Sequence, residues 1–88
     1  MDFADLLQRY FATSDIAELT PAAMEAGTER MLVDLGMEKD SGKRFALWSL
    51  LYMLGEAPDL EATFKGHDDR EAARNFMDMM ASIEGEST

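Results

Sequence analysis

The sequence contains no cysteine and only one histidine among its 88 residues. Without cysteine the chain can form neither disulfides nor thiolate metal sites, and nothing in it points to an oxidising compartment. The histidine precedes an aspartate, but a dinuclear phosphohydrolase centre on this His67–Asp68 pair would need several further histidines. We therefore predict no metal site and no cofactor.

Basic residues are also few, because eight lysines and arginines stand against eighteen acids and leave a net charge of −10. This excess argues against binding to nucleic-acid phosphates or to anionic membrane surfaces. Long apolar runs are missing too, since none reaches the roughly 20 residues of a membrane span. Asp2 and Asp5 stand where a secretory signal would carry bases. We expect a cytoplasmic protein.

The longest apolar stretch lies at the middle of the chain, in residues 44–54, and contains no β-branched residue. At 100° per residue its apolar side chains fill the whole circumference of a helix, so the helix should be surrounded by protein. Its one small hydroxyl, Ser49, should bond back to a carbonyl oxygen one turn earlier. The stretch predicts a buried central helix over about 42–54.

Apolar side chains at helical spacing predict further helices on both sides of this one. Thr20–Pro21 is a strong helix start, Gly36 suits a left-handed helix end, and Gly55 should end the central helix. Gly27 lies inside a predicted helix at a cost of about 1 kcal/mol relative to alanine, which indicates close approach of another helix. The expected elements are Asp2–Ala12, a turn at Asp15–Leu19, Pro21–Leu35, Gly42–Leu54, Pro58–Lys65 and a last helix from Asp68–Asp69 to about Glu84.

These elements predict an all-α fold, a small orthogonal bundle of four to five helices around the central helix. The joints are short and no linker separates two regions, so we expect one domain over residues 1–88. The tail at 85–88 should be frayed.

Charge is unevenly distributed: −5 in residues 1–36, +1 in 37–55 and −6 in 56–88. The middle segment owes its sign to Lys39, Lys43 and Arg44, near the start of the central helix. One interpretation is that these bases pair with acids of neighbouring helices. The other is a contact point for an anionic group or an acidic partner.

Two internal methionines fall outside the predicted core. Met37 lies in a predicted loop, and Met79 lies off the inward stripe of the last helix. Methionine fills gaps in cores but also adapts to varied partners. We include Met37 and Met79, with Lys39, Lys43 and Arg44, in a candidate interaction surface.

No combination of residues indicates catalysis. The apolar segment offers only Ser49 and Tyr52, and neither has a histidine or lysine partner nearby in the sequence. We therefore expect a non-enzymatic interaction or regulatory module, whose partner is an unknown protein or a second copy in a homodimer. An acidic decoy that occupies a nucleic-acid-binding site on a basic protein is an alternative hypothesis.

A further alternative comes from Asp34-Leu35-Gly36, followed by Asp40-Ser41 at the start of the central helix. This pattern resembles acyl carrier proteins, which are small, acidic and all-helical. The resemblance implies a phosphopantetheine group on Ser41. The chain departs from the family pattern at Gly42, where carriers have leucine, and at Lys43 and Arg44, where they have acids.

The central-helix prediction has a direct test in Trp48→Ala. Removing an indole from a packed core costs about 3–5 kcal/mol, so the variant should be unfolded or nearly so. Circular dichroism and thermal melting measure this outcome, and a variant that melts like the parent would contradict a buried central helix.

Overall fold

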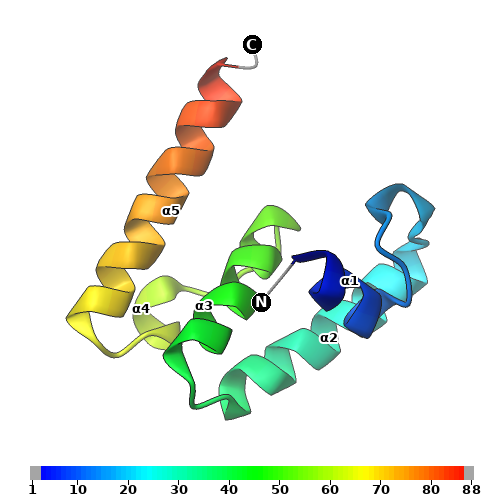
Figure 1. Ribbon diagram of the computed structural model, residues 1–88, viewed down its shortest axis with the longest axis horizontal. Coiled ribbons are helices and arrows are strands. Elements are labelled where there is room, and N and C mark those ends of the chain that lie inside the picture. The colour runs from blue at the N-terminus through cyan, green and yellow to red at the C-terminus, as the bar shows by residue number, and fades with distance from the viewer. Residues whose placement is uncertain (1–2, 87–88) are drawn as a thin grey trace. The chain divides into compact units, whose positions relative to one another are not determined.

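The computed structural model describes residues 3–86 and has in that range five α-helices, one 3-10 turn and no strand, which confirms the all-α fold. By their packing the residues divide into two compact units, the first ending at Ala57 and the second beginning at Pro58. The elements are α1 (Phe3–Phe11), a 3-10 turn (Ile16–Glu18), α2 (Pro21–Met37), α3 (Ser41–Met53), α4 (Leu60–Thr63) and α5 (His67–Glu86) (Figure 1).

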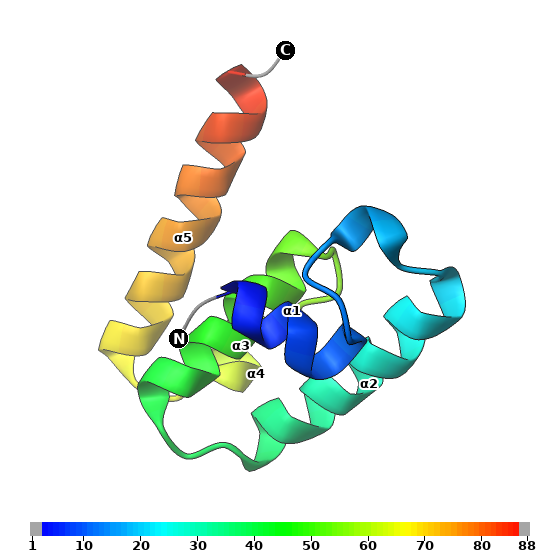
Figure 2. The ribbon, with the colours of Figure 1, turned by 45° about the vertical axis from the view of Figure 1, so that its right-hand side comes forward.

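In the first unit α1, α2 and α3 pack on one another, with α1 lying against α2 in both views (Figures 1 and 2). The central helix supplies three of the most deeply buried side chains, since Trp48, Leu50 and Leu51 are at most 1% exposed. It is not covered all round, however, because Met53 is 42% exposed. The buried apolar residues of this unit are Leu6, Leu7, Tyr10, Phe11, Met31, Leu35, Leu47, Trp48, Leu50 and Leu51.

The predicted end of α2 is wrong. The helix continues through Gly36 to Met37 and ends at Glu38, which has extended backbone angles. The physical reason is the guanidinium of Arg44, which donates hydrogen bonds to the carbonyl oxygens of Leu35 (2.7 Å) and Glu38 (2.8 Å). Carbonyl groups at this helix end are thereby satisfied from α3, and a left-handed glycine is not needed.

The predicted start of α2 at Thr20 and the predicted end of α3 at Gly55 are confirmed, and Asp40 caps the start of α3. The Thr20 hydroxyl accepts from the backbone N–H of Ala23 at 3.1 Å, and the Asp40 carboxylate accepts from that of Lys43 at 2.9 Å. Gly55 ends α3 with a φ of +81°, and its N–H and that of the next residue bond back to the last turn. Such a left-handed residue satisfies carbonyl groups that the helix itself leaves free.

In the second unit α4 is a single turn, two residues shorter at each end than the predicted Pro58–Lys65. α5 begins at His67 and runs to Glu86, so the first half of the tail predicted to fray is helical. Residues 87–88 of that tail lie outside the described range.

Two arginines of α5 join it to α4. Arg70 donates to the carbonyl oxygens of Phe64 (2.5 Å) and Glu61 (2.8 Å), and Arg74 bonds the Glu61 carboxylate at 3.0 Å. Carbonyl groups at the end of a one-turn helix find few partners within it. The guanidinium of Arg70 donates the missing hydrogen bonds to these carbonyl groups, as the guanidinium of Arg44 does at the end of α2.

Gly27 confirms the close approach that its position in the sequence predicted. A Cβ at this residue would overlap the ring of Phe11 and lie 2.9 Å from the carbonyl oxygen of Tyr10. Phe11 is itself buried, so its ring has little space into which to move. The end of α1 is thus seated directly on the backbone of α2.

The two interior glycines of α2 should respond to alanine with opposite signs. Gly27→Ala should lower the free energy of unfolding by about 1–3 kcal/mol, because overpacking outweighs the gain in helix propensity. Gly36→Ala should raise it by up to about 1 kcal/mol, because a Cβ there meets no heavy atom within 4 Å. Urea unfolding of the two variants measures both effects, and stabilisation of both would contradict the close contact.

Candidate functional site

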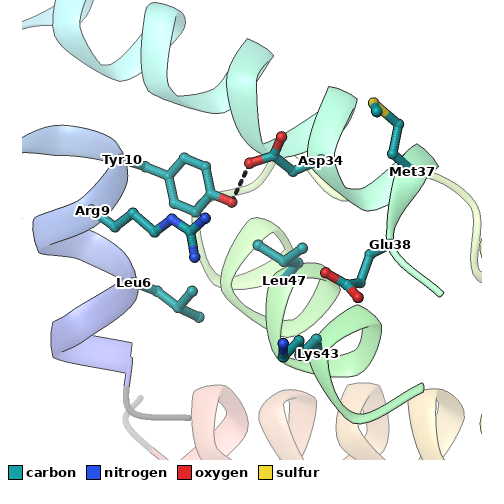
Figure 3. A pocket seen from close by; sticks show the side chains of 8 residues that line it. All are labelled: Leu6, Arg9, Tyr10, Asp34, Met37, Glu38, Lys43 and Leu47. Atoms are coloured by element: carbon teal, nitrogen blue, oxygen red, sulfur yellow. Dashed lines mark hydrogen bonds between the residues drawn. The ribbon is translucent and has the colours of Figure 1, made fainter. Parts of the chain in front are cut away.

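The first unit contains a pocket of about 250 Å³ between its three helices (Figure 3). Leu6 and Leu47 form the apolar part of the pocket lining, and acidic and basic side chains form the charged part. All lining residues belong to the first unit: Leu6, Arg9, Tyr10, Asp34, Met37, Glu38, Lys43 and Leu47.

One wall of the pocket is a hydrogen bond between α1 and α2. The hydroxyl of Tyr10 donates to the Asp34 carboxylate at 2.5 Å (Figure 3). The guanidinium groups of Arg9 and Arg30 lie 5.8 and 5.7 Å from the centre of the Tyr10 ring, within cation–π distance. The tyrosine is 5% exposed, so this polar group is held inside the unit by its partners.

This environment raises the pKa of Tyr10 to about 12. Burial is the largest cause, because it disfavours the phenolate, and the hydrogen bond to Asp34 and the negative charge of Asp34 act in the same direction. The charges of Arg9 and Arg30 oppose them. At neutral pH the hydroxyl therefore stays protonated and donates to Asp34, a role that fixes α1 to α2.

The three bases predicted as one cluster have different environments. Arg44 is half-buried and bonds carbonyl oxygens at the end of α2, as described above. Lys39 and Lys43 are exposed, and neither has an acid within 4.0 Å of its amine among the side chains that the structure describes. Lys43 lines the pocket together with a second cation, Arg9 of α1. Arg9 is not among the residues that the sequence predicted for the candidate interaction surface.

The two candidate methionines belong to different compact units. Met37 is the last residue of α2, not part of a loop, and is 75% exposed at the rim of the pocket. Met79 lies on α5 in the second unit and is 52% exposed. Only Met37 adjoins the pocket of the first unit.

The serines differ in access. Ser41 is the exposed first residue of α3. Ser49 is 1% exposed, and its hydroxyl has no hydrogen-bond partner, so the predicted bond to a carbonyl oxygen one turn earlier is not formed. The buried hydroxyl of Thr28 on α2 is likewise without a partner. Such groups cost free energy in a core.

At the start of α5, the exposed side chains of His67, Asp68 and Glu71 bring potential ligand atoms within 4.8 Å of one another. The imidazole Nε2 of His67 lies 3.5 Å from a carboxylate oxygen of Glu71, one helical turn away. Exposed acids in a first helical turn also favour the helix dipole, so capping accounts for their presence.

Comparisons of the chain with family models, with curated proteins and with solved structures find no match. Among the helices of the described residues, none combines the length and the apolar character that crossing a bilayer requires.

The Tyr10–Asp34 bond should make stability depend on alkaline pH. The tyrosine pKa is about 10 in unfolded chains and about 12 in the fold, so folding favours the protonated form. This stabilisation is fully present below about pH 10 and is lost as the pH rises to about 12.

We therefore expect wild type to exceed Tyr10→Phe in free energy of unfolding by about 1–3 kcal/mol near neutrality, with the difference shrinking between about pH 10 and 12. Urea titrations of both proteins across this range measure it. A difference that stays constant over the window would contradict the role assigned to the bond.

Proposed function

We propose that this chain is a non-enzymatic interaction module that binds a protein partner through the outer face of α2. The observation that carries the proposal is the exposure of Val33 (60%) and Met37 (75%) on a helix whose opposite face enters the core. Residues four apart share one helix face, so the two side chains form a continuous apolar surface. Exposed apolar surface of this kind is typical of interaction sites.

The surroundings of this face suit a protein partner. Met37 adjoins the pocket, and Val33 adjoins a shallow groove that Arg9 and Arg30 also line. Protein interfaces combine an apolar centre with a polar rim and are enriched in arginine and methionine. An apolar side chain of the partner would lie between Val33 and Met37, with polar groups of the partner near the arginines.

Carrier function is the second candidate, and the position of Ser41 favours it. The serine is exposed at the first residue of α3 and directly follows the capping Asp40. In the resemblance to acyl carrier proteins, the modified serine also stands at the start of a helix. A covalent phosphopantetheine on Ser41 would make this reading the leading one.

Native mass spectrometry of the protein isolated gently from its own cells separates the two candidates. We expect an unmodified chain bound to a partner protein or to itself, with Met37→Glu isolated alone because a buried carboxylate disfavours the contact. Met79→Glu, a matched change at an exposed methionine of the second unit, should keep the partner.

Retention of the partner by Met37→Glu, with an unchanged circular dichroism spectrum, would contradict binding through α2. A mass increase that disappears in Ser41→Ala would establish modification of that serine instead.

A further inference from the structure

The outer face of α2 carries more than its two large apolar residues. With 3.6 residues per turn, six exposed positions fall within a sector of about 100° on the side away from the buried residues. We call them the outer stripe: Ala22, Ala26, Glu29, Arg30, Val33 and Met37. Arg30 lies at one edge of this sector, where its guanidinium is also 5.7 Å from the centre of the Tyr10 ring. The buried residues of the same helix, Gly27, Thr28, Met31 and Leu35, occupy the opposite side.

The outer stripe is complementary to itself when a second copy of α2 runs antiparallel to the first. We place the two-fold axis of the pair between Glu29 and Arg30. Glu29 of each chain then faces Arg30 of the other, which gives two pairs of opposite charge. In the same alignment Val33 faces Ala26 of the copy, and Met37 faces Ala22 of the copy. Small residues thus oppose large ones, and acid opposes base, along the whole helix.

We propose that the partner of the outer stripe is a second copy of this chain, bound in an antiparallel α2–α2 contact with two-fold symmetry. This inference rests on the proposed function and names its partner. A two-fold contact requires a surface that complements itself, and the outer stripe meets that requirement in charge and in size. Alanine opposite each large residue lets the helices pack within the usual interaxial distance of 8–10 Å.

The contact should be modest in strength. α2 has 17 residues and is about 25 Å long, so one helix face buries less than the roughly 800 Å² per partner of a standard interface. Each chain has a net charge of −10, so two chains also repel each other. At about 0.15 M salt the Debye length is about 8 Å, so salt screens the repulsion between distant charges. Charge pairs in direct contact are screened less.

Disulfide trapping tests the contact and its register, because the chain has no cysteine of its own. The variant Ala26→Cys/Val33→Cys places two thiols on each chain that face each other across the proposed contact. On helices with a Cα radius of about 2.3 Å and axes about 9–10 Å apart, facing Cα atoms lie about 4.4–5.4 Å apart. This is within the roughly 4.4–6.8 Å that a disulfide bridges. We expect oxidation in dilute solution to give a covalent dimer, visible on a non-reducing gel.

Ala26→Cys alone is the matched control. In the antiparallel register its thiol lies about 10 Å along the axis from the same thiol of the copy, seven residues away, and should cross-link at least tenfold more slowly. Equal cross-linking of the single and double variants would indicate a parallel contact or random collision, and would overturn the proposal.

Charge reversal provides a second measurement in solution. Glu29→Arg places two arginines opposite two arginines, and Arg30→Glu places acids opposite acids. Each should weaken self-association about tenfold, because two attractive pairs become repulsive. A mixture of the two variants should recover dimers that contain one chain of each, and the double variant Glu29→Arg/Arg30→Glu should recover its own dimer.

Sedimentation across a wide concentration range measures the fraction of dimer for the wild type and each variant. Circular dichroism is the control for folding. A wild-type chain that stays monomeric up to millimolar concentration would overturn self-association. In that case loss of a different protein by Met37→Glu would still support the proposed function, so the two proposals fail separately.

Discussion

The close approach of α1 to α2 at Gly27 is the constraint on which the rest of the first unit depends. The Phe11 ring and the carbonyl oxygen of Tyr10 occupy the space that a Cβ would need at this position. The helices therefore lie closer together than packing through two layers of side chains would allow. This closeness brings the Tyr10 hydroxyl to the Asp34 carboxylate, two turns further along α2. One wall of the pocket is thus a consequence of a missing side chain.

Arg44 shows why three bases close in sequence do not share one role. A guanidinium is a planar fork of N–H groups and can bond two carbonyl oxygens at once, as Arg44 does at the end of α2. Lys39 and Lys43 carry compact charges on flexible stems and stay exposed. The two positive charges that line the pocket, opposite the acids Asp34 and Glu38, are therefore those of Lys43 and of Arg9, which lies more than thirty residues earlier in the chain.

The sequence predicts those parts of the fold whose causes are local. Apolar spacing located the helices, and caps such as Thr20 and Gly55 depend on neighbouring residues alone. The end of α2 depends on Arg44 in the next helix, so local reasoning stopped the helix at Gly36 too early. The Tyr10–Asp34 bond joins residues 24 apart. Its signal in the sequence was faint: an acid beside the inward stripe of one helix, and a phenol within the stripe of another.

α2 has apolar residues on two opposite faces, and such a helix could in principle bury either one. The choice is decided by volume rather than by hydrophobicity, because only the face that contains Gly27 has room for the Phe11 ring. If the helix were turned over, Ala26 or Val33 would lie against α1. The Cβ groups of these two residues would hold the backbones of α1 and α2 apart. The Tyr10 hydroxyl would then lose Asp34 and remain buried without a partner, at a cost of about 1–3 kcal/mol. Because Gly27 and Asp34 fix the orientation, Val33 and Met37 can be apolar on the outside without competing for the core.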